Sequence, residues 1–184
     1  MEVTGWITLA AVIVALGIGV YSFIQTNRLK RAEKRERLLN EIIKWSIDVA
    51  NCRFENKSIT NVFYHKDVKE IQSKFWQYLC DIQNGLKMQQ TVGIYIRNIS
   101  PNFGQHITRP VVTLLKVILD YIDVLEKALR LIEEISTGQT KLSDEESKRL
   151  NEYIEKMGNS SKLLDKSAIQ VIEEAVKIKT RDIG

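Results

Sequence analysis

The longest uncharged stretch of the chain lies near its beginning, between Val3 and Asn27. Within it, nineteen mostly apolar residues run from Trp6 to Ile24, WITLAAVIVALGIGVYSFI. At a helical rise of about 1.5 Å per residue they cover roughly 28 Å, which is about the hydrocarbon thickness of a bilayer. We therefore interpret residues 1–27 as an N-terminal transmembrane anchor.

The charges on either side of this run predict whether it is cleaved as a signal peptide and how it is oriented in the membrane. Only Glu2 carries a side-chain charge before the run, whereas a cleaved signal peptide begins with a basic region. After the run, residues 28–37 form a basic juxtamembrane stalk. Its basic residues are Arg28, Lys30, Arg31, Lys34, Arg35 and Arg37. Because such residues stay on the cytoplasmic side, we expect a single-pass membrane protein with its N-terminus outside and residues 38–184 in the cytoplasm.

The basic stalk has two interpretations. It holds six basic and two acidic residues, so its net charge equals the +4 of the whole chain and the remainder is close to neutral. This concentration favours contact with anionic lipid headgroups and argues against a nucleic-acid-binding domain. The alternative is that the charge only fixes the orientation of the anchor. The opposite orientation would place the domain outside and remove the lipid and cytoplasmic expectations together.

Small residues line one side of the anchor. Ala11, Ala15 and Gly19 recur every four residues, a pattern that lets two helix backbones approach closely. They are therefore candidate interface residues for a homo-oligomer or for another membrane helix. The alternative is that small residues are common in membrane helices whether or not the helices associate.

The about 157 residues after the anchor predict one all-α domain. Two prolines and nine glycines in the whole chain leave few turns for a β architecture. Apolar periodicity predicts helices at about 38–52, 67–97, 109–137 and 144–180. The loops between them are short to moderate, which predicts an antiparallel up-down four-helix bundle that continues the transmembrane helix.

Two of these helices carry extended apolar faces. The third helix has a wide stripe that consists of Leu114, Leu115, Ile118, Ile122, Leu125, Leu129 and Ile132. The fourth has a heptad seam that consists of Leu150, Ile154, Met157, Ser161, Leu164, Ala168, Val171, Ala175 and Ile178. The stripe predicts packing against several neighbours, and the seam predicts near-parallel packing against a close one.

Local signals predict where helices begin and where they weaken. Pro110 suits the first turn of the third helix, and Ser143 with Glu146 forms the S-x-x-E capping box that begins the fourth. Gly93 stands among β-branched residues and is expected to loosen or bend the second helix. Gly158 is expected to be a weak point where the fourth helix kinks or briefly breaks.

The up-down arrangement also predicts where further basic residues gather. The turn around Pro101 and the C-terminus would both lie on the membrane-facing side of the bundle. The basic residues expected there are Arg97, Arg109, Lys177, Lys179 and Arg181. They would extend the basic stalk into a larger lipid-facing surface. The alternative is that they are ordinary solvated helix ends.

Few residues suggest chemistry. His65 and His106 fall in successive loops, which an up-down bundle places at opposite ends, so they should not share a metal ion or a catalytic dyad. Cys52 and Cys80 belong to no paired motif and are interpreted as small apolar side chains. Two carboxylate clusters are interpreted as solvated helix surface and as a helix start: Asp120, Asp123 and Glu126, and Asp144, Glu145 and Glu146. We predict no catalytic, cofactor-binding or metal-binding residue and no cofactor.

Trp45 and Trp76 are expected on neighbouring helices. Core packing is the favoured interpretation, because tryptophan is mostly buried on average. An exposed aromatic docking patch is the alternative.

No stretch of the chain resembles a characterised family. The favoured hypothesis is a non-enzymatic, membrane-anchored helical bundle that acts as a protein-interaction or scaffolding module at the cytoplasmic membrane face. Its expected partners are the lipid bilayer and either a second copy or another protein. The alternative is a signalling or sensory adaptor that couples the transmembrane helix to the bundle. An enzyme with an unrecognised site ranks third.

Overall fold

The computed structural model describes residues 2–55, 68–136 and 142–181, without the side chains of residues 2–15, 70 and 72. These residues are helical or irregular, and the described part contains no strand. The chain divides into two compact units, Met1–Asn40 and Glu41–Gly184, which we call the amino-terminal unit and the bundle unit. Each is described separately below.

The amino-terminal unit consists of one helix. It is the first part of α1, which runs from Glu2 to Ala50 without interruption. No proline and, after Gly19, no glycine occurs in this helix, so nothing in its sequence breaks the hydrogen-bond ladder. Every residue from 28 to 37 is exposed, as expected for a stalk that is polar on nearly every side.

Within the described residues, no helix combines the length and the hydropathy that a membrane crossing requires. Of the predicted crossing, Trp6–Ile24, only residues 16–24 are among the side chains that the structure describes. Residues 6–15 lie outside them.

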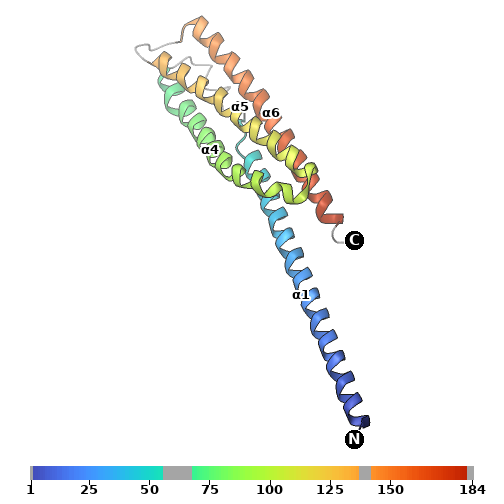
Figure 1. The fold of residues 1–184 in the computed structure, drawn as a ribbon. Helices are drawn as coiled ribbons and strands as arrows, with labels where there is room; N and C mark the ends of the chain where they lie inside the picture. Colours follow the sequence, from blue (N-terminus) through green and yellow to red (C-terminus); the bar gives the residue numbers. More distant parts are fainter. Residues whose placement is uncertain (1, 56–67, 137–141, 182–184) are drawn as a thin grey trace. The chain divides into compact units, whose positions relative to one another are not determined.

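In its described residues, the bundle unit contains the last turns of α1 and three further long helices (Figure 1). A short α3 (Val68–Glu70) passes through a π-helical turn, η2 (Ile71–Phe75), into α4 (Trp76–Ile99). A 3₁₀ turn, η3 (Ser100–Phe103), leads to α5 (Gln105–Ser136). The last helix is α6 (Asp144–Arg181). The prediction of an all-helical bundle is confirmed.

Helix α5 lies between α4 and α6 and packs against both (Figure 1). All seven residues of its predicted stripe are buried, together with Val111, Val117, Tyr121, Ala128, Leu131 and Ile135. A helix that is apolar over so much of its circumference can be covered only by neighbours on more than one side. The core of the unit is therefore organised around α5.

The end of α1 runs antiparallel to α4. The indole nitrogen of Trp45 donates to the carbonyl oxygen of Gln89 at 2.9 Å. Four residues earlier on α1 and six later on α4, the Tyr95 hydroxyl donates to Glu41 at 3.1 Å. The two bonds therefore pair the helices in opposite directions.

The expectation that Gly93 loosens the second helix is wrong, while its alternative, a bend, stays a prediction. Helix α4 is continuous through Gly93, which is buried. A Cβ atom at this position would lie 2.5 Å from Leu115 Cδ2 and 2.6 Å from Trp45 Cζ2. The missing side chain thus lets α4, α5 and the end of α1 approach closely.

The third helix begins earlier than Pro110 suggests. Gly104 adopts φ 82°, a conformation in which glycine carries little strain. Its carbonyl oxygen accepts hydrogen bonds from the N–H groups of Ile107 and Thr108 at 3.3 and 3.1 Å and from the Thr108 hydroxyl at 3.0 Å. Helix α5 therefore begins at Gln105, and Pro110 lies in its second turn.

The fourth helix follows its sequence signals closely. Ser143 and Glu146 form the predicted capping box: the Ser143 N–H donates to the Glu146 carboxylate at 2.9 Å, and the Glu146 N–H donates to the Ser143 hydroxyl at 3.3 Å. Seven of the nine seam residues are buried; Ile154 and Ile178 are half-buried. Helix α6 continues through Gly158, so the predicted break there is wrong, while a kink at Gly158 stays a prediction.

Candidate functional site

The most distinctive polar arrangement of the bundle unit lies where the chain leaves α1. We call residues 53–55 the crossing segment. The N–H of Phe54 donates to the Ser161 hydroxyl of α6 at 3.1 Å, and that hydroxyl donates to the Phe54 carbonyl oxygen at 3.4 Å. The N–H of Glu55 donates to the Tyr78 hydroxyl of α4 at 2.9 Å. The rings of Phe54 and Tyr78 lie 5.9 Å apart. The crossing segment therefore ties α4 to α6.

Tyr121 of α5 lies close to the crossing segment. Its side chain is fully buried, and its hydroxyl has no hydrogen-bond partner within the described part of the chain. Burial raises the pKa of Tyr121 far above its usual value, while the nearby Ser161 hydroxyl and Phe54 backbone partly oppose this shift. Within the described part of the chain, this neutral phenol is a packing group of the core.

Sequence reasoning missed this cluster. Tyr121 could have been assigned to the buried stripe, since it lies three residues after Ile118 and four before Leu125. Phe54 and Ser161 are 107 residues apart, and nothing in the sequence pairs them.

A hollow of about 660 Å³ opens beside the crossing segment. Its charged lining residues are Arg53, Glu55, Glu155, Lys162 and Asp165. Arg53 and Glu55 pair with each other at 3.1 Å, and both are more than half exposed. Three carboxylates and two cations line the hollow, so the lining has only a small excess of negative charge.

Two of the three predicted carboxylates on α5 take part in ion pairs at the surface. Glu126 pairs with Lys87 at 3.2 Å, and Asp123 pairs with Lys127 one turn along the same helix. No group of three or more histidine, cysteine, aspartate or glutamate side chains is placed to hold a metal ion among the residues that the structure describes.

His106 is exposed in the first turn of α5, near Glu174. His65 lies outside the described residues, so its predicted separation from His106 stays a prediction.

Both cysteines are free and half-buried. Burial raises the pKa of Cys52, and the Asp48 carboxylate adds to the shift. Burial also raises the pKa of Cys80, with a smaller effect from Asp81. Fewer of these thiols are ionised at neutral pH than in a free cysteine, which lowers their reactivity.

The two tryptophans have different surroundings. Trp45 is 2% exposed and packs against Gly93, as a core residue should. Trp76 is half-buried at the beginning of α4, where its indole nitrogen donates to Glu133 at 3.4 Å. Seventeen residues of helix, about 25 Å, separate Trp76 from Gly93, so the two rings do not meet.

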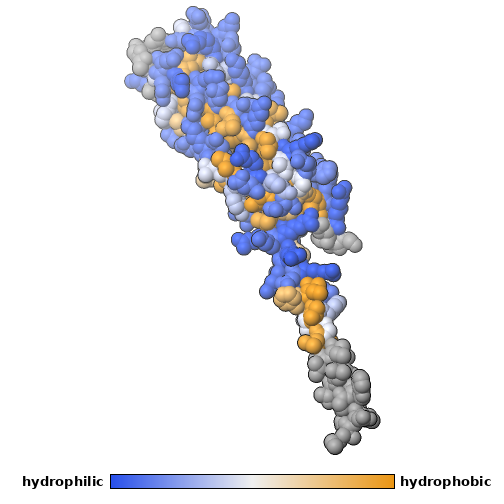
Figure 2. Space-filling view, in the orientation of Figure 1, coloured by the Kyte–Doolittle hydropathy of each residue, from blue (hydrophilic) through white to orange (hydrophobic). Residues whose placement is uncertain are grey.

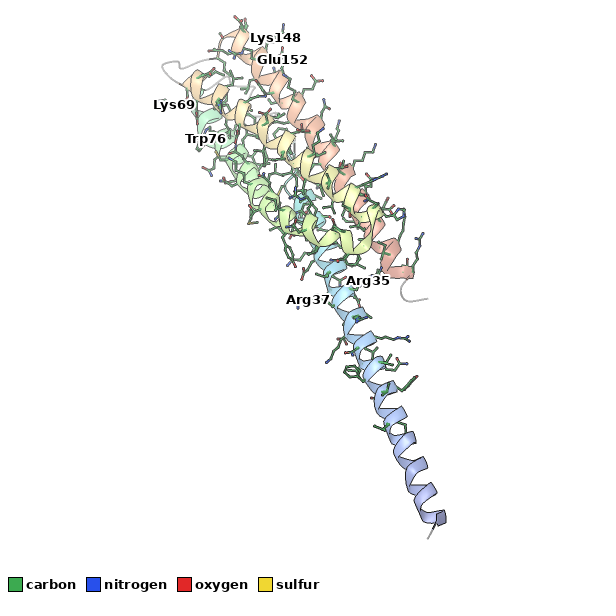
Figure 3. The ribbon with its side chains drawn as sticks, in the orientation of Figure 1. Arg35, Arg37, Lys69, Trp76, Lys148 and Glu152 are labelled. Carbon is green, nitrogen blue, oxygen red and sulfur yellow. The ribbon has the colours of Figure 1, made fainter. Side chains whose placement is uncertain are left out.

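The predicted membrane residues lie in the amino-terminal unit. Ala11 and Ala15 are outside the described side chains, and a Cβ atom at Gly19 would have no neighbour within 4 Å. The six basic residues of the stalk are all exposed, and Figure 3 labels Arg35 and Arg37 on α1. Helix association and lipid contact by these residues stay predictions.

The chain matches no protein-family model, and neither a curated protein nor a solved structure is detectably similar to it.

Proposed function

We propose that this protein is a non-enzymatic helical-bundle module, anchored in a membrane by residues Trp6–Ile24, that binds a protein partner or a second copy at the cytoplasmic face. One observation carries the anchor: consecutive turns of α1 expose large apolar side chains and are followed directly by an exposed basic stalk. In Figure 2 this apolar group appears as orange atoms followed by blue ones.

The exposed side chains between residues 16 and 24 are unusual for a helix in water. Leu16, Ile18, Val20, Tyr21 and Phe23 are each 60 to 69% exposed. Covering such a side chain is worth about 1.5–3 kcal/mol, so several in succession strongly favour an apolar environment. Lipid supplies that environment on every side of the helix, whereas a single partner helix would cover only one.

The charges support one orientation and one lipid chemistry. The stalk that follows the apolar side chains has only exposed residues, and its excess of positive charge favours the cytoplasmic side. There Arg28, Lys30 and Arg31, with Lys34, Arg35 and Arg37, would lie against anionic headgroups.

The heptad seam of α6 does not supply the partner surface. Seven of its nine residues are buried by packing inside the bundle unit. Partner recognition therefore falls to the outer surface of the bundle or to the small-residue side of the anchor at Ala11, Ala15 and Gly19.

A signalling or sensory adaptor is the second candidate. It is favoured by the continuity of α1 from Glu2 to Ala50, with Trp45 buried against Gly93 near its end. Inserting flexible glycines near Ala32 would uncouple an adaptor, whereas a passive tether would keep its activity. An enzyme with an unrecognised site remains third.

The anchor and its orientation can be tested together in intact cells. We would replace Cys52 and Cys80 by alanine, add one cysteine beside Gly184, and apply a membrane-impermeant thiol reagent. We expect the protein to resist alkaline carbonate extraction and the added cysteine to react only after permeabilisation. Release by carbonate would refute the anchor, and labelling in intact cells would refute the orientation. Crosslinking from the protected side then identifies the partner.

A further inference from the structure

The sequence between Asp81 and Asp120 contains no acidic residue. In the structure these residues form the second half of α4, the η3 turn and the first half of α5. We call residues 82–119 the basic hairpin. The other halves of the same two helices carry Asp81, Asp120, Asp123, Glu126, Glu133 and Glu134. In α4 and α5, acidic residues are therefore confined to the halves that lie outside the basic hairpin.

Three cations of the hairpin are available to an anionic surface. Arg97, Arg109 and Lys116 are exposed, and none of them forms an ion pair in the part of the chain that the structure describes. Lys87 is different, because Glu126 pairs with it at 3.2 Å. On α6, Lys177 is likewise paired with Glu174. The charge that remains uncompensated thus lies on the last turns of α4 and the first turns of α5.

Apolar side chains are exposed in the same turns. Ile94 and Tyr95 on α4 are 47 and 50% exposed, and Val112 on α5 is 47% exposed. Cations mixed with aliphatic and aromatic side chains are typical of surfaces that lie in the headgroup region of a membrane. Nucleic-acid surfaces depend instead on many phosphate contacts, and three cations supply few.

The hairpin lies at the end of the bundle unit where the chain enters. The Tyr95 hydroxyl, one turn before the end of α4, donates to Glu41, the first residue of the unit. Only residues 28–40 connect Glu41 to the uncharged run that ends at Asn27. Thirteen residues span at most about 45 Å even when fully extended, so an anchored chain keeps the hairpin near the bilayer.

We propose that the basic hairpin docks on the anionic lipid headgroups of the membrane that holds the anchor. This inference rests on the proposed anchor and adds a second contact, made by the bundle unit itself. Arg97, Arg109 and Lys116 bind phosphate and carboxylate groups of the headgroups. Ile94 and Val112 enter the apolar edge of the interface.

The docking can be measured in the full chain reconstituted into lipid nanodiscs. A version without Cys52 and Cys80 receives a fluorophore on Thr113→Cys, an exposed position of α5. The discs contain a headgroup-linked quencher, with either phosphatidylcholine alone or 30% phosphatidylserine. We expect stronger quenching in the anionic discs, and its reversal in high salt.

A matched pair of triple variants isolates the charge. Each basic group near an anionic surface contributes about fivefold to binding, so the variant Arg97→Gln, Arg109→Gln, Lys116→Gln should weaken docking about a hundredfold. The control variant, Lys148→Gln, Arg149→Gln, Lys156→Gln, removes the same charge from the beginning of α6 and should dock normally. Figure 3 labels Lys148 and Glu152 there, with Trp76, at the other end of the bundle unit.

The possible results separate the two proposals. Equal quenching in neutral and anionic discs, or unchanged quenching in the first triple variant, would overturn the docking and leave the anchor intact. Failure of the chain to enter the discs would refute both. A 20-nucleotide single strand that abolishes quenching at low concentration would reassign the surface to nucleic acid. Circular dichroism of each variant confirms that the helices are retained.

Discussion

Two glycines in the interior of long helices should respond in opposite directions to the same substitution. At Gly158 of α6 a Cβ atom would have no neighbour within 4 Å. Alanine there gains helix propensity without a clash, so we expect Gly158→Ala to stabilise the bundle unit by about 0.5–1 kcal/mol.

At Gly93 of α4 the same methyl group would lie closer to two side chains than van der Waals contact allows. Leu115 Cδ2, at 2.5 Å, ends a flexible chain and can move. Trp45 Cζ2, at 2.6 Å, belongs to a rigid ring that is 2% exposed and is held by its bond to Gln89. Overpacking of a core typically costs about 1–3 kcal/mol, and the higher helix propensity of alanine offsets up to about 1 kcal/mol of this cost. We therefore expect Gly93→Ala to lose about 1–2 kcal/mol.

The assay is chemical and thermal unfolding of the full chain in mild detergent, followed by circular dichroism. For a unit of this size, 1 kcal/mol shifts Tm by about 3 °C. Gly93→Ala should melt about 3–6 °C below the unmodified protein, and Gly158→Ala up to about 3 °C above it. A Gly93→Ala protein as stable as Gly158→Ala would refute the close approach of the three helices.

The other interactions of the bundle give further expectations. Tyr121→Phe removes a buried hydroxyl that has no hydrogen-bond partner among the described residues, so the unfolding free energy should be unchanged or higher by about 1 kcal/mol; a loss of that size would mean that the hydroxyl is bonded. Ser161→Ala removes the hydroxyl that binds the crossing segment and should cost about 1–2 kcal/mol in the same assay, whereas an unchanged midpoint would contradict that bond. Hydrogen bonds from Ser143 lower the pKa of Glu146. The stability that this cap contributes is therefore fully present above the ordinary glutamate pKa and is lost as pH falls through the lowered pKa. Ser143→Ala should remove that part of the acid dependence in a pH series of unfolding curves. The raised pKa of Cys52 predicts alkylation in the folded state that is slower than for free cysteine at pH 7 and accelerates as pH rises, and rapid reaction at pH 7 would contradict it.

Helix positions were predictable because the signals are local. The capping box of Ser143 and Glu146 depends on two residues three positions apart, and the buried stripe of α5 depends on a period that any isolated helix would show. Such signals can be recognised without knowing which helices pack against each other.

The errors arose where the same residue serves two physical purposes. A glycine inside a helix either weakens it or lets another backbone approach, and only the positions of Leu115 and Trp45 distinguish the two at Gly93. Pro110 suits a first turn, but the actual beginning of α5 depends on the backbone conformation of Gly104. The crossing segment could not be predicted at all, since its bonds to Tyr78 and Ser161 are set by packing across the bundle.

The bond between Phe54 and Ser161 also has a consequence for biosynthesis. Its partners are 107 residues apart, and chains grow at about 5–20 residues per second, so Phe54 waits roughly 5–20 s for its partner to be made. During that time the inward side of α1, with Ile42, Trp45 and Val49, has no completed core to enter. An anchor that inserts first would hold this uncovered helix end at the membrane surface, away from other nascent chains, until α6 arrives to close the bundle.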